Sequence, residues 1–296
     1  MPKLTITSDS GSILPEKARE HGFTMIPCPV IMDGKSYLDT EIDMDKLYAR
    51  LETKENVPTT STANMGEFAQ FFTEIGEKAE AILHICMSSV FSGHYNIALQ
   101  GRKLAGEKMP GKRIEVVDTR AMGTGVALVA MEAAEAAAQG KNIDEVLELV
   151  GGLVPQVSVL LARDTLFYQA KGGRIFEART WAEAELATSF RSITEVDAST
   201  GGALKPVARA KTIAHIMDKL VEITRERAAG KKLVGIIGHA RVPDRAEKLK
   251  EMLLAEVQFD EILVSEASAS VAVHGGIGII DYSFCPEFER ASFDDS

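Results

Sequence analysis

One stretch of the chain decides the fold: Ile82-Leu-His-Ile-Cys-Met-Ser-Ser-Val-Phe-Ser-Gly-His-Tyr-Asn-Ile-Ala98. It opens with an apolar run short enough for a buried strand and then breaks into a turn of small residues with three serines. After the turn, apolar residues recur at helical spacing. In an open α/β sheet, a strand, a turn and a helix in this order place backbone N–H groups and the positive helix end at the ligand-binding edge. The stretch therefore predicts an α/β sheet whose edge at this turn faces an anion.

Ser92 and Gly93 lie where this turn becomes the helix. A serine at such a position can cap the helix, bind a ligand, or do both in different states. The stretch alone supports capping and binding equally, so the other loops decide. Four loops collect hydroxyls, glycines and cations, at residues 59–64, 88–94, 171–174 and 274–278. If each flanks a strand end, they meet in one crevice, where their neutral donors with His274 and Arg174 suit a carboxylate or a phosphate.

Strands and helices alternate along the first half of the chain. Strands are expected at residues 4–7, 23–32, 35–38, 82–86 and 113–118, and the main helices at 43–51, 66–78, 94–104, 121–139 and 142–153. This alternation predicts a mostly parallel sheet with helices on both faces. Asp33 and Gly34 signal a hairpin turn, and Asp43 is placed to cap the helix after it.

A domain boundary is expected near Pro155, which gives a first α/β domain at residues 1–155 and a second at 156–296. The second half predicts a mixed sheet, because hairpin and crossover patterns both occur in it. Strands are expected at residues 157–162, 191–196, 204–208, 233–238 and 261–264, and helices at 164–171, 178–187, 213–228 and 243–255. Residues 270–280 are expected as extended segments around a glycine turn.

Composition narrows the class of protein. The chain has 296 residues, of which 45% are hydrophobic and 26% charged, as in a globular protein with room for two domains. Its net charge of −10 argues against a nucleic-acid partner and allows at most transient contact with a membrane. The chain shows neither the pattern of a signal peptide nor an apolar run of the ~20 residues that a membrane span needs. A cytoplasmic location with buried, reduced cysteines is therefore predicted.

Several motifs of common enzymes and metal proteins do not occur in the sequence. It has no glycine-lysine phosphate loop, no Gly-x-Gly-x-x-Gly opening a helix, no nucleophile elbow and no His-Glu-x-x-His. The three cysteines and six histidines share no metal-ligand spacing. We therefore expect neither a metal nor a cofactor.

Individual polar residues carry little information by themselves. His84 lies within the apolar strand and is expected to be a core histidine, whereas His94 is expected to face solvent in the first helical turn. Asp9 and Asp118 end strands, and could bind a metal or act as a base; turn-forming roles are favoured. Taken alone, Arg174 is explained as a solvated charge. The functional interpretation depends on the combination of loops.

Six motifs follow one another along the chain: Thr7-Ser-Asp-Ser10, Pro58-Thr-Thr-Ser61, Ser88-Ser-Val-Phe-Ser-Gly93, Val117-Asp-Thr119, Lys171-Gly-Gly-Arg-Ile175 and His274-Gly-Gly-Ile-Gly278. Together they resemble the DegV family of bacterial fatty-acid-binding proteins, the acyl-carrier subunits of fatty acid kinase. The match runs from Leu4 to about Tyr282. Each motif alone is weak, and the ordered set is specific.

The resemblance implies two α/β domains with a ligand tunnel between them that holds one long-chain fatty acid. It also implies that hydroxyl groups and a histidine fix the carboxylate of that fatty acid. Matched residue by residue, the carboxylate site consists of Thr60, Ser61, Ser92, Gly93 and His274. The bound fatty acid is then a ligand, and no other cofactor is implied.

The resemblance further implies a partner. A separate ATP-dependent fatty acid kinase phosphorylates the bound carboxylate, so that the chain itself is a carrier and not an enzyme, with a role in phospholipid metabolism. Arg174 is similar to a residue of the site mouth that also belongs to the kinase docking surface, and Arg209 extends that surface.

Two alternatives remain open at this point. The chain could act alone as an acyl hydrolase or transferase through Ser92, with His94 or His274 as the base. It could also be a regulatory sensor of acyl phosphates. His94 stands where the DegV family commonly has threonine, so a second imidazole accompanies His274. An enzyme would turn over an activated acyl ester unaided, whereas a carrier would only bind it; the carrier is favoured.

Overall fold

The computed structural model describes residues 3–10 and 13–287. Its first half contains a four-stranded sheet with the order β2-β1-β6-β7, in which every pairing is parallel. The strands are β1 (Leu4–Asp9), β2 (Phe23–Ile26), β6 (Ala81–Cys86) and β7 (Arg113–Asp118). The helices around it are α1 (Pro15–Glu20), α3 (Met65–Gly76), α4 (His94–Lys108), α5 (Thr124–Ala138) and α6 (Ile143–Leu153).

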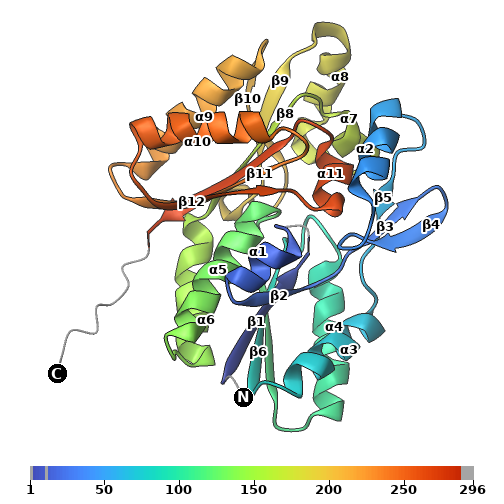
Figure 1. The fold of residues 1–296 in the computed structure, drawn as a ribbon, viewed down its shortest axis with the longest axis vertical. Helices are drawn as coiled ribbons and strands as arrows, with labels where there is room; N and C mark the ends of the chain where they lie inside the picture. Colours follow the sequence, from blue (N-terminus) through green and yellow to red (C-terminus); the bar gives the residue numbers. More distant parts are fainter. Residues whose placement is uncertain (1–2, 11–12, 288–296) are drawn as a thin grey trace.

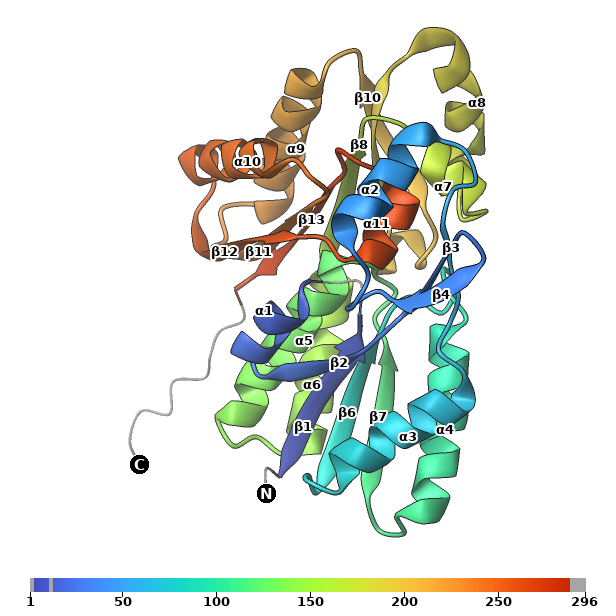
Figure 2. The ribbon, with the colours of Figure 1, turned by 45° about the vertical axis from the view of Figure 1, so that its right-hand side comes forward.

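Both faces of this sheet are covered, as predicted. Figures 1 and 2 show α5 and α6 on one side of the strands and α3 and α4 on the other. Side chains alternate along β6, so Leu83 and Ile85 pack in the core that includes α5, while Ile82 and Cys86 pack in the core that includes α3 and α4. Because β6 is buried on both faces, its sequence is a continuous apolar run. This is the run from which the α/β sheet was predicted.

The second half forms a six-stranded mixed sheet with the order β10-β9-β8-β13-β11-β12. Only β11 and β12 pair in parallel, and the other neighbours are antiparallel. Its strands are β8 (Ser158–Arg163), β9 (Arg191–Glu195), β10 (Lys205–Ala210), β11 (Leu233–His239), β12 (Phe259–Glu266) and β13 (Ile280–Pro286). Its helices are α7 (Phe167–Lys171), α8 (Arg179–Thr188), α9 (Ile213–Ala228), α10 (Pro243–Glu256) and α11 (Ala269–Gly275). The α/β class, with a parallel first sheet and a mixed second sheet, is confirmed.

A small third sheet of β3 (Pro29–Met32), β4 (Lys35–Leu38) and β5 (Thr59–Thr60) lies beside α2 (Met44–Thr53) and α11 (Figure 2). The predicted hairpin joins β3 to β4. Asp33 and Gly34 at its tip have φ angles of +53° and +75°, the left-handed conformation that an Asp-Gly pair adopts readily. This sheet carries Thr60 toward the second half of the chain.

The predicted cap of α2 is confirmed: the Asp43 carboxylate accepts a 3.1 Å hydrogen bond from the backbone N–H of Lys46. We expect Asp43→Ala to lower the free energy of unfolding by about 1 kcal/mol, because that N–H loses its partner. Chemical denaturation measures the change, and Asp43→Asn, which can still accept the bond, is the control. Equal losses in both variants would contradict the capping role.

The expected extended segment at residues 270–280 is wrong in its first part. Residues Ala269–Gly275 form α11, and Gly276 ends it with a φ angle of +78°. Its apolar residues suggested a strand because a short run that is buried on all sides has no visible helical period. Val273 and Ala272 are both almost fully buried. Tertiary packing therefore decided the conformation here.

Helix α5 joins the two large sheets. The Asp281 carboxylate on β13 accepts hydrogen bonds from the backbone N–H of Thr124 (3.0 Å) and from its hydroxyl (2.9 Å), at the first residue of α5. The large sheets share no strand among the described residues, and the change from one to the other falls between β7 and β8. The domain boundary near Pro155 remains a prediction. Within residues 3–10 and 13–287, no helix combines the length and the apolar character needed to cross a membrane.

Candidate functional site

A cavity of about 60 Å³ lies where the four predicted loops meet. All four contribute to its lining, although they are far apart in the sequence. The lining includes five of the seven residues named in advance: Thr60, Ser61, Ser92, Arg174 and His274. Gly93 adjoins Ser92 but does not line the cavity itself, and the exposed Arg209 lies away from it. The loops therefore converge as expected.

His274 is held at the end of α11 by a hydroxyl group. Its Nε2 lies 2.7 Å from Thr60 Oγ1 on β5. Burial, with the nearby positive charges of Arg174 and Arg163, lowers the pKa of His274 to about 4. The imidazole is therefore neutral at pH 7. A neutral imidazole and a hydroxyl can both donate to an anion.

The glycine pair at residues 172–173 does more than end α7. A Cβ atom built on Gly172 would lie 2.5 Å from His274 Nδ1, so this position admits no larger side chain while the imidazole stays in place. The Gly172 carbonyl also accepts a 2.8 Å hydrogen bond from Arg174 Nη1. Gly172 thus lets the loop carrying Arg174 approach His274 closely.

Arg174 is half-buried and belongs to the cavity wall. Its carbonyl accepts a 2.9 Å hydrogen bond from Gln169 Nε2, which fixes the loop as well as the side chain. Among the described residues that line the cavity, Arg174 is the one arginine or lysine. It therefore provides permanent positive charge beside neutral donors.

His94 does not face solvent, so that expectation is wrong. Its side chain is 3% exposed, and its Nδ1 lies 3.2 Å from Asp9 Oδ1 at the end of β1. Burial by itself would lower the pKa of His94, but the Asp9 carboxylate raises it overall. Conversely, although burial favours protonation of Asp9, the two imidazoles of His94 and His84 lower its pKa. The sequence did not show this pair because the partners come from distant segments.

His84 is a core histidine, as expected. It is fully buried, and its Nδ1 lies 3.0 Å from Thr7 Oγ1. The rings of Phe68 and Phe72 meet it edge-on. Asp118 forms a turn, as favoured, because its carboxylate accepts a 2.9 Å hydrogen bond from the backbone N–H of Arg120. The same carboxylate accepts hydrogen bonds from the hydroxyl (2.5 Å) and backbone N–H (3.2 Å) of Ser89.

Sequence reasoning missed a buried carboxylate that ties the cavity wall together. Asp39 accepts hydrogen bonds from Ser10 Oγ (2.7 Å), Ser270 Oγ (2.9 Å) and the backbone N–H of Cys28 (2.8 Å). Burial raises the pKa of Asp39, and these hydrogen bonds oppose that rise. The three donors also line the cavity. Ser10 follows the first parallel strand, and its position was the one signal that could have pointed here.

Ser92 has a local role as well as a place in the wall. Its Oγ accepts a 3.3 Å hydrogen bond from the backbone N–H of His94, while Gly93 occupies the N-cap position of α4. In the part of the chain that the structure describes, no hydrogen bond joins Ser92 Oγ to the ring of His94 or His274. The serine is therefore placed for contact with a ligand but lacks a base bound to it.

Solved structures of similar proteins share this architecture. A DegV family protein from Thermus thermophilus, described by its fatty acid binding, superposes with a TM-score of 0.85 at 26% identity, over 96% of this chain and 99% of that one. A DegV family protein from Eubacterium eligens, loaded with heptadecanoic acid, gives a TM-score of 0.85 at 18% identity, over 96% and 99% of the two chains, and supports the fold alone.

Sequence comparison finds relatives of the same family over nearly the whole chain. A DegV domain-containing protein of Streptomyces coelicolor is 30% identical over 281 residues, which cover 94% of this chain and 96% of that protein. One of Clostridium perfringens is 27% identical over 284 residues, which cover 95% and 98%. The family model described as "Uncharacterised protein, DegV family" matches residues 3–287. The chain belongs to the DegV family.

Proposed function

We propose that this chain binds one long-chain fatty acid, with the carboxylate in the cavity. The observation that carries the proposal is the convergence of hydroxyl groups, the neutral imidazole of His274 and the Arg174 guanidinium on one cavity formed by both halves of the chain. Such donors offset the cost of desolvating a carboxylate. The fatty acid binding named for the Thermus thermophilus relative supports the same ligand class.

The cavity volume suits the headgroup better than the whole ligand. A cavity of about 60 Å³ has room for a few water molecules at ~10–15 Å³ of cavity volume each, and therefore for a carboxylate but not for a long acyl chain. The apolar part of the wall includes Met87, Phe91 and Met122. Methionine side chains adapt readily, so we expect them to move aside for the acyl chain. Burying the fifteen apolar carbons of a sixteen-carbon acid at ~0.8 kcal/mol each contributes about 12 kcal/mol, which favours that rearrangement.

The proposal has a second part, which concerns the role of the bound carboxylate. We propose that it is presented to a separate ATP-dependent fatty acid kinase, which forms the acyl phosphate for phospholipid metabolism. Arg174 would lie at the site mouth, and the exposed Arg209 beyond it. The Arg209 guanidinium lies over the rings of Trp181 (5.7 Å) and Phe190 (5.5 Å), and these contacts hold its charge in a fixed place on the surface. The cytoplasmic location stays a prediction.

Arg209→Glu should slow kinase-dependent phosphorylation and leave fatty acid affinity within about twofold, because a rim charge acts mainly on association rate. ATP turnover with the cognate kinase, at low and moderate salt, measures the first quantity, and lipid titration measures the second. Arg225→Glu, an exposed arginine on α9, is the matched control. Unchanged turnover at both salt concentrations would remove Arg209 from the docking surface.

The alternative of an acyl hydrolase or transferase has less support. His274 Nε2 is engaged by Thr60, and His94 Nδ1 faces Asp9. Neither arrangement supplies Ser92 with the hydrogen-bonded base that an activated nucleophile needs. A carrier should therefore leave an activated acyl ester such as p-nitrophenyl palmitate intact over many binding lifetimes. Turnover of the ester by wild-type protein that disappears in Ser92→Ala would favour the hydrolase or transferase alternative.

Isothermal titration with palmitate and hexadecanol tests the headgroup directly. The two ligands have equal chain length and differ in the carboxylate, so a charged donor set should favour palmitate by at least about tenfold. Equal affinities for palmitate and hexadecanol would mean that the cavity does not distinguish a carboxylate from a hydroxyl group. A lack of binding to both ligands, after delipidation of folded protein, would end the proposal.

Ser92→Ala should weaken palmitate binding by about fivefold, since one hydrogen bond to the ligand contributes roughly 1 kcal/mol. Its weak contact with the His94 N–H implies little change in the melting temperature of lipid-free protein. Ser36→Ala, on the exposed strand β4, is the matched control. A stability loss with unchanged affinity would show that Ser92 serves the helix alone.

A further inference from the structure

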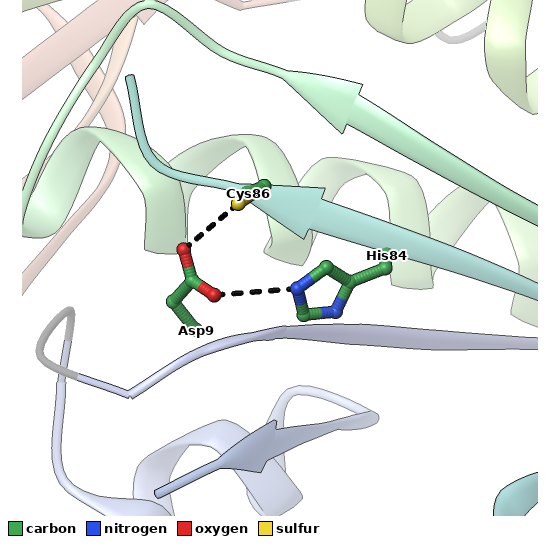
Figure 3. A group of neighbouring side chains, drawn as sticks. All are labelled: Asp9, His84 and Cys86. Carbon is green, nitrogen blue, oxygen red and sulfur yellow. Dashed lines mark hydrogen bonds and ion pairs between the residues drawn. The ribbon is translucent and has the colours of Figure 1, made fainter. Parts of the chain in front are cut away.

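Three metal-ligating side chains converge at the carboxyl ends of β1 and β6, next to the cavity (Figure 3). Asp9 Oδ1 lies 3.3 Å from His84 Nε2, and Asp9 Oδ2 lies 3.2 Å from Cys86 Sγ. The three ligand atoms are all within 4.8 Å of one another. Each side chain is at most 1% exposed. A carboxylate, an imidazole and a thiol in one place are the ligand types of a zinc site.

A second imidazole lies beside this cluster, in contact with Asp9 but outside the group of three ligand atoms. His94 Nδ1 lies 3.2 Å from Asp9 Oδ1, and the residue is 3% exposed. This nitrogen is buried and contacts Asp9 as an ion pair, without the alignment of a hydrogen bond. His94 also lines the cavity, which provides a path for an ion to enter.

The separation between nitrogen and oxygen in the cluster resembles that of two ligands around an ion. Charge-assisted hydrogen bonds between an imidazole and a carboxylate are usually about 2.7–2.9 Å long. Two ligand atoms about 2.0–2.2 Å from zinc at a tetrahedral angle lie roughly 3.3–3.6 Å apart. The Nε2 atom of His84 lies 3.3 Å from Asp9 Oδ1. We propose that Asp9, His84 and Cys86 form a buried binding site for Zn²⁺, with its fourth coordination position on the side of His94.

Neighbouring groups orient the proposed ligands. With a proton on Nδ1, His84 donates to Thr7 Oγ1 at 3.0 Å, and its Nε2 lone pair is free for the metal. The backbone N–H of Met87 donates to Asp9 Oδ2 at 2.8 Å. Such outer contacts set the tautomer and direction of metal ligands. One carboxylate and one thiolate would neutralise Zn²⁺, as a fully buried site requires.

Metal analysis and cobalt substitution test the proposal. Full-length protein, purified without a metal-affinity step, should contain one zinc per chain or take up one after dialysis against Zn²⁺. Metal-stripped protein should then melt at a higher temperature when Zn²⁺ is added. Co²⁺ in the same site should show thiolate-to-cobalt charge-transfer absorption. Cys86→Ser should lose this absorption, whereas Cys285→Ser, at a buried cysteine on β13, should keep it.

A milder variant covers the case in which Cys86→Ser fails to fold. Thr7→Val keeps the side-chain shape but removes the partner of His84 Nδ1, so zinc affinity should fall by about 10- to 100-fold. Folded wild-type protein that shows no bound zinc, no cobalt absorption and no thermal shift would overturn the proposal. Fatty acid binding is measured separately, so it can succeed or fail independently of this result.

Discussion

Arg174→Glu is expected to weaken palmitate binding by about 100-fold or more, which corresponds to about 3 kcal/mol. The side chain is half-buried in the cavity wall, and the Gly172 carbonyl holds its guanidinium. Its charge helps to lower the pKa of His274, so it acts on the place proposed for the carboxylate. Reversing that charge replaces an attraction for the ligand by a repulsion, in a site with limited solvent.

Titration of delipidated protein with palmitate measures this effect. Arg209→Glu, the same change at an exposed arginine that does not line the cavity, should stay within about twofold of wild type. Arg174→Lys keeps the charge and should lose much less affinity than the glutamate variant. If Arg174→Glu binds palmitate normally, Arg174 has no part in the carboxylate site, and only a docking role is left for it.

Asp281→Asn is expected to stabilise the chain at neutral pH by up to about 3 kcal/mol. Burial raises the pKa of Asp281 to about 6, against the hydrogen bonds from Thr124 and the charge of Arg163, which lower it. The unfolded carboxyl has a pKa near 4, so ionisation opposes folding increasingly as the pH rises from about 4 to about 6. An asparagine carries no such charge, and its amide oxygen can still accept from the Thr124 N–H.

Urea unfolding of wild type and Asp281→Asn at several pH values isolates this contribution. The stability difference should be small near pH 4, grow up to about pH 6 and then stay constant. Asp218→Asn, on the exposed face of α9, should remain within about 0.5 kcal/mol of wild type throughout. A difference that does not vary with pH would mean that Asp281 is not buried as a charged group at neutral pH.

The sequence revealed the parts of the site that depend on local pattern. A strand that is buried on both faces has a continuous apolar run, so β6 and the serine turn after it could be located. The loops with Thr60, Ser92, Arg174 and His274 follow elements whose order implies a shared crevice. Their meeting in one cavity was therefore predictable without knowing any distance.

The remaining features depend on contacts between distant segments. His94 was expected in solvent because nothing near it in the chain suggests its partner Asp9. Asp39 joins Ser10 to Ser270 through bonds that no spacing rule encodes. Similarly, α11 was mistaken for extended chain because its burial on all sides conceals its period.

The central claim is that the cavity holds the carboxylate of a fatty acid. Organic extraction of protein purified from a bacterial host, followed by quantitative mass spectrometry, tests it most directly. We predict about one long-chain fatty acid per wild-type chain and a strongly reduced amount in Arg174→Glu, with Arg209→Glu like wild type. Wild-type protein that carries no fatty acid, and that also fails to take up added palmitate or oleate, would contradict the claim.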